Sequence, residues 1–265
     1  MPTFYTVILL AGDRPGDVLA QRSPGKRKAL LLLQGRPMIL YVLETLLAGA
    51  HVGDIVVVAN RVAEIEANAD LQAFVALHKA RISFREGAGS PATSVMKCMK
   101  ELGGPRSVLV TTADNPLLTP QTLDSFCEGI GDDADAVVGL ARERDIRPAF
   151  PDVKRTYIRL GGEGYSGCNL FALTAEGGPK AARAWSEVEG RRKKPWQLVM
   201  HFGVWTLLRA VTGFLDLDGA MGAVSRAMGL KAKAVILNDP AASMDVDRPD
   251  HIPMAESVLA ARKTS

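Results

Sequence analysis

The chain has 265 residues, a formal net charge of +3 and 47% hydrophobic residues, which is enough apolar material for a substantial core. Its lysines and arginines gather in two patches, 26–28 and 191–194, and this distribution argues against general nucleic-acid binding. The three cysteines are widely spaced and form no C-x-x-C pair, which indicates reduced packing residues rather than a disulfide framework or a zinc site. Without a targeting segment or an apolar run of about 18 residues, we expect a soluble, cytoplasmic protein with a single domain over 1–265.

Short β-rich apolar runs alternate with helical patterns along the first half of the chain. Strands are predicted at 5–11, 54–59, 81–85, 107–112 and 135–141. Helices are predicted between them at 37–50, 62–79, 91–102 and 120–129. This alternation is typical of a Rossmann-like α/β fold with a mostly parallel sheet, in which ligands bind at the carboxyl ends of the strands.

The pattern changes after about residue 145. Two strands are predicted at 155–160 and 167–173, around a glycine-rich turn at 161–167. A helical insertion at 180–228 is followed by a strand at 232–237 and a helix at 249–262. Residues 195–215 carry an apolar stripe behind a basic run, which is compatible with weak peripheral contact with an anionic membrane or with buried core. Core is the preferred interpretation, because apolar stripes in globular proteins are usually buried.

The first strand ends in a glycine-bearing, basic loop that runs from Gly12 to Lys28. Such a loop offers backbone N–H groups and fixed positive charge to a polyphosphate, which suggests an enzyme that handles nucleotides. It matches neither the P-loop pattern nor the G-x-G-x-x-G dinucleotide pattern. A solvated surface loop is the structural alternative.

Two acidic segments are candidates for a metal site. Asp114 directly follows a predicted buried strand, where a carboxylate suits a divalent ion that bridges phosphates. An Asx-type turn before Pro116 is the alternative role for Asp114. Asp245 and Asp247 alternate along an extended segment, and we expect one of them to meet the metal from the other side.

No histidine is assigned to catalysis. The four histidines are scattered along the chain and form no Ser/His/Asp grouping and no metal-spaced grouping: His51, His78, His201 and His251.

Four segments together resemble the molybdenum-cofactor guanylyltransferase-like (MobA-like) nucleotidyltransferases. They are VILLAGDRPGD (7–17), KALLLLQGRPMILYVLETL (28–46), TTADNPLL (111–118) and MDVDRPDH (244–251). The resemblance implies a Rossmann-like fold of the glycosyltransferase-A type. It also implies transfer of a nucleoside monophosphate from a nucleoside triphosphate to a phosphorylated acceptor, with Mg²⁺ as cofactor and release of pyrophosphate.

Carried over by position, the resemblance makes Lys28 and Asp114 catalytic. It gives Asp114 as a metal ligand with Asp245 or Asp247 as the second, and a nucleotide site formed by Leu10, Ala11, Gly12, Asp13, Arg14, Lys28, Gly89, Ser90, Ser94 and Ala113. One departure is that Asp13 occupies the place of the family's usual second glycine. The loop that follows it up to Lys28 is also longer than usual.

The second half of the chain is expected to recognise a small, anionic, phosphorylated acceptor. The candidate contacts are Lys154, Arg155, Tyr157, Arg159, Asn169 and Lys194, although 191–194 also fits a solvated helix end. The helical insertion and its KKPW segment look like enzymes that activate lipid head groups, among them the cytidylyltransferase that acts on phosphoglycerate in ceramide phosphoglycerate synthesis. That likeness favours CTP as the donor.

Other functions stay open at this point. A guanylyltransferase or a sugar-phosphate nucleotidyltransferase would share the chemistry. A metal-dependent glycosyltransferase would share the fold but normally carries D-x-D at this strand end, whereas Asp114 is followed by Asn115 and Pro116. A non-catalytic nucleotide-binding module would be expected to lose Lys28 or Asp114, and both are present.

Overall fold

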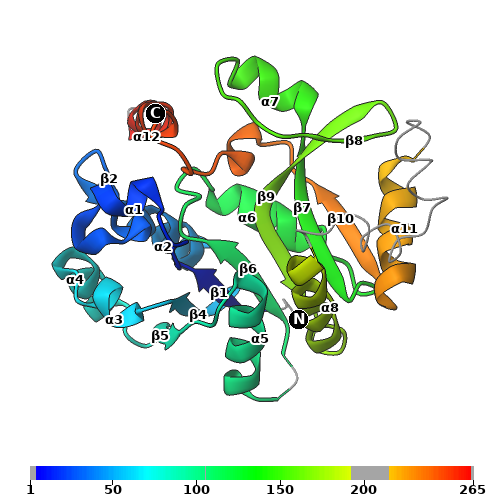
Figure 1. Ribbon diagram of the computed structural model, residues 1–265, viewed down its shortest axis with the longest axis horizontal. Helices are drawn as coiled ribbons and strands as arrows, with labels where there is room; N and C mark the ends of the chain where they lie inside the picture. Colours follow the sequence, from blue (N-terminus) through cyan, green and yellow to red (C-terminus); the bar gives the residue numbers. More distant parts are fainter. Residues whose placement is uncertain (1–3, 105, 192–214, 264–265) are drawn as a thin grey trace.

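The computed structural model describes residues 4–104, 106–191 and 215–263, and within these ranges an eight-stranded sheet forms the centre of the protein (Figure 1). The strand order is β10-β7-β9-β6-β1-β4-β5, with β8 paired to β9. The strands are β1 (Tyr5–Leu10), β4 (Val52–Ala59), β5 (Ile82–Glu86), β6 (Val108–Thr112), β7 (Ala136–Arg142), β8 (Ile158–Leu160), β9 (Glu163–Leu173) and β10 (Ala232–Ile236).

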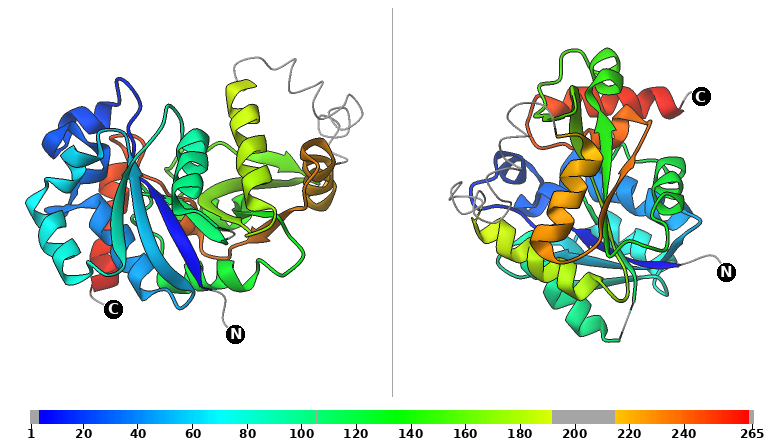
Figure 2. Two further views of the ribbon diagram at one scale, coloured as in Figure 1. Left: turned by 90° about the horizontal axis from the view of Figure 1, so that it is seen from below. Right: turned by 90° about the vertical axis from the view of Figure 1, so that its right-hand side faces the viewer.

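Helices cover both faces of this sheet. Alternate residues of β1 face opposite sides, so Val7 and Leu9 belong to one apolar cluster and Ile8 belongs to the other. The first face is covered by α2 (Met38–Ala48), α6 (Pro120–Glu128) and α12 (His251–Lys263). On the second face, α5 (Pro91–Leu102) and α8 (Gly178–Arg191) lie side by side (Figure 2). This arrangement confirms the predicted α/β, Rossmann-like fold.

The sheet is parallel throughout except at β9. Strands β1, β4, β5 and β6 are parallel neighbours, as are β7 and β10. Strand β9 runs antiparallel to both β6 and β7. The strand predicted at 167–173 begins earlier, at Glu163, so the predicted turn at 161–167 contracts to Gly161 and Gly162. Both glycines have positive φ, +57° and +81°, a conformation that glycine adopts without steric cost.

Several short elements escape the sequence patterns. The loop between β1 and Lys28 contains α1 (Val18–Arg22), which Asp17 caps by accepting hydrogen bonds from the N–H groups of Leu19 and Ala20. A two-stranded sheet of β2 (Leu32–Leu33) and β3 (Arg36–Pro37) precedes α2, and α7 (Glu143–Ala149) follows β7. None of these elements is long enough to show a hydrophobic period.

The helix predicted at 62–79 is divided into two. These are α3 (Val62–Glu66) and α4 (Ala69–Leu77), which lie at the β5 edge of the sheet (Figure 1). Asn68 separates them, because its side chain accepts a hydrogen bond from the N–H of Leu71 and starts a new helix.

The predicted insertion at 180–228 includes α8 and α11 (Leu217–Met228), with α11 against β10. Ala181 and Ala182 of α8 are buried in the second apolar cluster. Residues 192–214 lie outside the described residues, and with them Lys194 and most of the 195–215 stretch whose core or membrane role is open. No helix in the described part of the chain has the length and apolar character needed to cross a bilayer.

The three cysteines provide a test of the core. All are buried, and burial raises the pKa of the Cys98 thiol to about 11 and of the Cys127 and Cys168 thiols to about 12. The thiolate is the reactive form, so at pH 8 we expect the native protein to react with a disulfide reagent at least about a hundredfold more slowly than the unfolded chain. Rapid labelling of three thiols per native chain would contradict this packing.

Candidate active site

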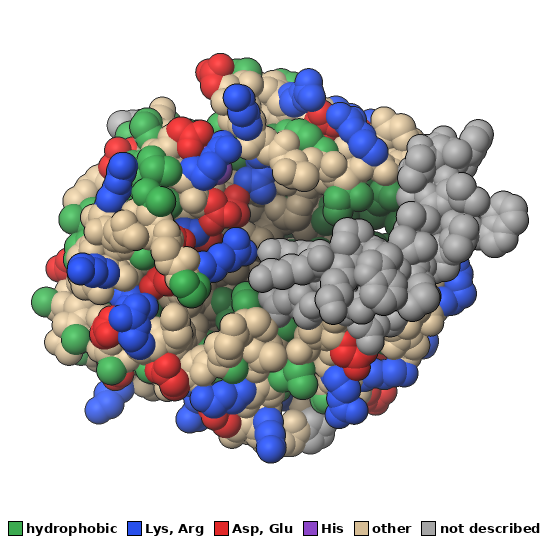
Figure 3. Space-filling model, viewed as in Figure 1, with side chains coloured by type: hydrophobic (Ala, Val, Ile, Leu, Met, Phe, Trp, Pro, Cys, Tyr) green, Lys and Arg blue, Asp and Glu red, His purple; other side chains and the backbone are tan. Residues whose placement is uncertain are grey.

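The carboxyl ends of β1, β4, β5 and β6 meet at one edge of the sheet, because these strands are parallel neighbours. A small pocket opens there, lined by Leu10, Ala11, Gly12, Asp13, Lys28, Ala29, Ala113 and Asp114. On the face of the molecule shown in Figure 3, acidic and basic side chains lie around a recess near the middle. Most of the residues predicted from the first loop and from the end of the fourth predicted strand therefore come together.

Asp13 anchors the long first loop. Its Oδ1 accepts a hydrogen bond from the backbone N–H of Lys28 at 2.9 Å, and its Oδ2 lies 2.9 Å from the guanidinium of Arg27. Arg27 is completely buried and also binds Glu64 of α3, at 2.6 Å. A buried charge requires such partners. The acidic residue that departs from the family pattern thus holds the segment that carries Lys28.

Sequence reasoning missed the role of Arg27. Two features of the sequence together could have indicated it: Asp13 stands where the family usually has a glycine, and Arg27 directly precedes Lys28. Charged residues that are buried are usually paired with an opposite charge. Lys26, two residues before Lys28, is exposed. The loop therefore turns Lys28 inward and Lys26 outward.

Lys28 is buried between two carboxylates. Its Nζ lies 2.5 Å from Oδ2 of Asp114 and also forms an ion pair with Asp247. Burial by itself lowers the pKa of Lys28, but the two carboxylates outweigh it and raise that pKa. The ammonium is thus fixed in its charged form.

The two carboxylates respond differently to the same ammonium. Burial raises the pKa of Asp114 against the pull of Lys28, and the nearby negative charges of Asp247 and Asp245 add to the rise. For Asp247, burial is the largest single effect and raises the pKa. The charge and hydrogen bond of Lys28, together with hydrogen bonds to Asp245 and Asp114, outweigh burial and lower the pKa of that carboxyl to about 2. Asp247 is the more exposed of the two side chains, which is consistent with its smaller cost of ionisation.

Asp114, Asp245 and Asp247 form the candidate metal site. Each offers one carboxylate oxygen, and these oxygens all lie within 4.8 Å of one another. Oδ1 of Asp114 is buried and has no hydrogen-bond partner among the described residues. Carboxylate oxygens are the ligands that Mg²⁺ prefers, so the residues present fit a divalent cation. The orphaned oxygen also argues against the Asx-turn alternative, in which the Asp114 side chain would bond to the following backbone.

The fold directs a carboxylate oxygen from each of Asp245 and Asp247, and not from one of them alone, toward Asp114. Residues two apart on an extended segment point to the same side, which brings both carboxylates toward Asp114. The backbone N–H of Val246, between them, donates a hydrogen bond to the carbonyl of Asp114 at 2.8 Å. This bond joins the 245–247 segment to the end of β6.

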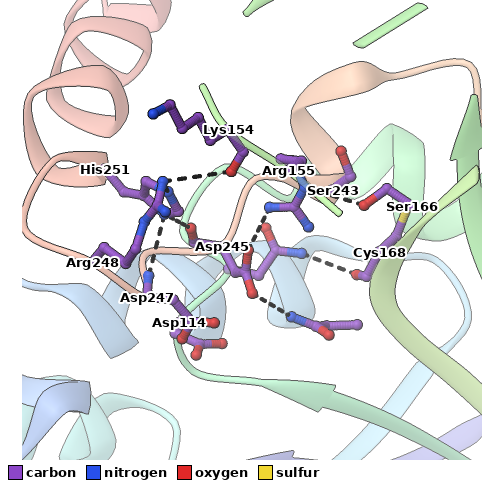
Figure 4. Close-up of polar contacts among 12 residues, drawn as sticks. Asp114, Lys154, Arg155, Ser166, Cys168, Ser243, Asp245, Asp247, Arg248 and His251 are labelled. Atoms are coloured by element: carbon purple, nitrogen blue, oxygen red, sulfur yellow. Dashed lines mark hydrogen bonds and ion pairs between the residues drawn. The ribbon is translucent and has the colours of Figure 1, made fainter. Parts of the chain in front are cut away.

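Two of the residues predicted to bind the acceptor, Arg155 and Asn169, contact Asp245, and Figure 4 shows Arg155 beside it. Arg155 binds Oδ1 of Asp245 at 2.6 Å and donates from Nε to Oγ of Ser166 at 3.1 Å. Asn169 donates to Oδ2 of Asp245 at 3.4 Å and has a left-handed φ of +51°. Asparagine tolerates that conformation better than most residues, and an irregularity in the pairing of β9 with β7 lies beside it.

The remaining acceptor candidates are less close to the triad. Arg159 forms an ion pair with Glu143 of α7 at 2.5 Å, Lys154 is exposed, and Tyr157 is half-buried against the core. Arg155 and Arg159 thus have carboxylate partners within the protein. Because these two arginines are paired, the stretch offers less uncompensated positive charge to a ligand than its number of cations implies.

Four residues predicted to bind the nucleotide do not line the pocket: Arg14, Gly89, Ser90 and Ser94. Arg14 is exposed on the first loop. Ser90 caps α5 by accepting from the N–H of Thr93. Ser94 lies one turn into the helix rather than at its start, and its hydroxyl accepts from the N–H of Ala88 at 2.8 Å. Ser90 and Ser94 therefore shape the loop after β5.

Asn115 is a further residue that sequence reasoning left without a role. Its side-chain nitrogen donates to the carbonyls of Cys168 at 3.2 Å and Ala242 at 2.9 Å. It thereby joins the end of β6 to β9 and to the short 3-10 helix η3 (Pro240–Ser243) that precedes Asp245. The Asn-Pro pair after Asp114 reads locally as a turn, so the long-range contacts are visible only in the fold.

The chain is similar to a known family and to several known proteins. A family model described as MobA-like NTP transferase domain matches residues 7–214. The bifunctional protein GlmU of Agrobacterium fabrum is 36% identical over 143 residues, which are 52% of this chain and 29% of that protein. The chain thus spans less than a third of the length of GlmU.

Two further similarities extend over nearly the whole chain. The 2-C-methyl-D-erythritol 4-phosphate cytidylyltransferase of Streptomyces avermitilis is 29% identical over 244 residues, covering 91% of this chain and 87% of that enzyme. The solved structure of a hypothetical transferase from Thermus thermophilus has a TM-score of 0.77 and 28% identity, and it covers 94% of this chain and 100% of that chain.

The contacts of Lys28 generate a prediction about metal affinity. The Lys28→Met substitution keeps the length of the side chain but removes the charge that competes for Asp114 and Asp247. We expect it to strengthen Mn²⁺ binding, measured by calorimetry without nucleotide, by at least about tenfold, or about 1.4 kcal/mol. The Lys26→Met variant, changed at an exposed position of the same loop, should bind Mn²⁺ as the native protein does. If the Lys28→Met variant bound Mn²⁺ no more tightly than the native protein, Lys28 would not compete with the metal for these carboxylates.

Proposed function

The chain belongs to the family of MobA-like NTP transferase domains, and we propose that it is a nucleotidyltransferase that moves CMP from CTP to a small phosphorylated acceptor, with release of pyrophosphate. One observation carries the proposal. A buried, charged lysine and three convergent aspartates lie at the edge of a pocket formed by the carboxyl ends of parallel strands. That combination suits the binding of a polyphosphate with a divalent cation.

The reaction requires alignment and charge neutralisation more than a covalent nucleophile. A phosphate oxygen of the acceptor attacks the α-phosphorus of the nucleotide, and the bond from that phosphorus to the pyrophosphate oxygen breaks. The attacking phosphate is already ionised at neutral pH, so no general base is needed. This agrees with the absence of a catalytic histidine or cysteine arrangement in the sequence.

The residues of the site have distinct parts in this reaction. Lys28 supplies positive charge to the phosphates, and its fixed protonation suits that task. Asp114, Asp245 and Asp247 would hold Mg²⁺, which neutralises phosphate charge when bound. The backbone from Leu10 to Asp13 and Ala113 line the pocket that would receive the nucleotide.

CTP is favoured as the donor on two grounds. The relative from Streptomyces avermitilis, which aligns with 91% of this chain, is named a cytidylyltransferase. The loop after β5 and the first turn of α5 carry small residues, GAGSPATS over 87–94, which would let a pyrimidine approach backbone groups closely. GTP, and with it a guanylyltransferase or sugar-phosphate nucleotidyltransferase activity, is the alternative within the same chemistry.

The acceptor is proposed to bind on the side of Asp245. Arg155 and Asn169 reach that carboxylate, and Lys154 and Tyr157 belong to the same stretch of chain. A small phosphorylated compound such as phosphoglycerate, a precursor of a lipid head group, suits this position. Arg159 and Lys194 remain candidates of the same proposal, the first paired with Glu143 and the second outside the described residues.

A glycosyltransferase is the alternative of another class. It would bind a sugar nucleotide and release no pyrophosphate. Pro116 stands where the second aspartate of a D-x-D motif would be, and Lys28 occupies the space beside Asp114. Both features favour nucleotidyl transfer.

The function is tested by pyrophosphate release. Purified protein with Mg²⁺ is incubated with each of the four triphosphates and with a panel of phosphorylated acids, polyols and sugars. We expect release with CTP and one class of acceptor. Preference for GTP would overturn the cytidylyl assignment, and sugar transfer from a nucleotide sugar without pyrophosphate would overturn the reaction class.

Asp114→Ala provides the matching test of the site. We expect at least about a hundredfold loss of turnover, because a carboxylate that organises charge at the phosphates is removed. The substitution also removes one of the two carboxylate partners of buried Lys28, so we expect a lower melting temperature and compare turnover at a temperature at which the variant is folded. Asp54→Ala, an exposed change on β4, serves as the control. Near-native turnover of the Asp114 variant would remove it from the site.

A further inference from the structure

His251 makes two complementary contacts beside the candidate metal site. It is buried at the start of α12, with Nδ1 at 2.8 Å from the carbonyl oxygen of Asp245 and Nε2 at 3.1 Å from the guanidinium of Arg248 (Figure 4). A carbonyl oxygen only accepts, so Nδ1 carries the hydrogen and Nε2 accepts from Arg248. A single neutral tautomer satisfies both contacts. The N–H of Asp247 lies 3.4 Å from the same Nδ1, a longer contact than that to the carbonyl.

These contacts act on one peptide group. The carbonyl of Asp245 and the N–H of Val246 belong to the same peptide unit, which is planar. His251 holds its oxygen, and the carbonyl of Asp114 accepts from its nitrogen at 2.8 Å. The peptide plane that joins Asp245 to Val246 is therefore fixed from both sides.

Rotation of this peptide would swing one or both carboxylates away from Asp114. Arg248 extends the chain of contacts, because it also reaches the carbonyl of Lys154 at 3.5 Å and Oδ2 of Asp250 at 3.0 Å. The ring of His251 is thus held in place by a residue that touches the stretch proposed to face the acceptor.

We propose that His251 is a positioning residue that orients Asp245 and Asp247 as metal ligands by fixing the peptide between them. The inference deepens the proposed function and rests on its metal site. The histidine acts through the backbone and does not touch the reacting groups. This role is compatible with the sequence expectation, which assigned His251 no catalysis.

The test compares two substitutions at one position. The His251→Asn variant keeps a side-chain N–H that can reach the Asp245 carbonyl, whereas the His251→Leu variant removes the donor and retains an apolar volume. Binding of Mn²⁺ is measured by electron paramagnetic resonance without nucleotide or acceptor. We expect about tenfold weaker binding, or more, for the leucine variant and less than about threefold weakening for the asparagine variant.

Two controls separate positioning from a general loss of structure. The His78→Leu variant changes a histidine at the end of α4, next to the amino end of β5, and should bind Mn²⁺ as the native protein does. In the native protein, long-range ¹H–¹⁵N NMR should report the Nδ1–H tautomer of His251, a result that needs no variant to fold.

Native Mn²⁺ affinity in a folded His251→Leu variant would overturn the proposal. So would equal losses in the asparagine and leucine variants, or an Nε2–H tautomer in the native protein. Because these measurements contain no nucleotide, they are independent of whether CTP is the donor. An absence of CTP-dependent turnover with normal metal behaviour would count against the proposed function and leave the positioning role standing.

Discussion

The ion pairs of Lys28 with Asp114 and Asp247 are the interaction on which the rest of the site depends. The partners lie 86 and 219 residues from Lys28 in sequence, so three remote segments must meet for these charges to be satisfied. A buried ammonium without carboxylates would be costly, and the carboxylates without a cation would repel one another. Charge balance therefore couples the first loop, the end of β6 and the segment after η3.

Polar contacts in the surrounding backbone keep those segments in register. Asp13 and Arg27 fix the peptide of Lys28 from the loop side. Asn115 joins β6 to β9 and η3, and the peptide between Asp245 and Val246 is held from both sides. Each bond satisfies a group that would otherwise lose water without compensation. The chemistry of the pocket thus rests partly on side chains that do not line it, such as Arg27 and Asn115.

This arrangement also changes how the charges of the second half are interpreted. In the sequence, Arg155 and Arg159 read as cations available to an anionic acceptor. In the fold, Arg155 pairs with Asp245 and Arg159 with Glu143. Net positive charge toward a ligand depends on such internal pairing as much as on composition, because a paired guanidinium presents little uncompensated charge. An acceptor bound near Asp245 would meet a charge-balanced network in which Arg155 is already positioned.

The sequence by itself determined the fold class, the approximate limits of most strands and helices, and the principal charged residues of the candidate site. It could do so because apolar periods of two and 3.6 are local, and because strand ends in a parallel sheet share one edge. Asp114 was accordingly identified at a strand end, whereas Asp245 and Asp247 were identified in an extended acidic segment and Lys28 from the family resemblance.

Only the tertiary structure decided which of these groups meet and how they are held. That Asp245 and Asp247 both face Asp114, and that Arg27 is buried against Asp13 and Glu64, depend on contacts between separate segments of the chain. The antiparallel direction of β9 and the left-handed backbone of Asn169 were likewise visible only in the fold. A local sequence pattern indicates whether a residue lies in a helix or a strand and which side of that element it occupies. The contacts of its side chain are set by how whole elements pack, because burying an unpaired polar group costs free energy.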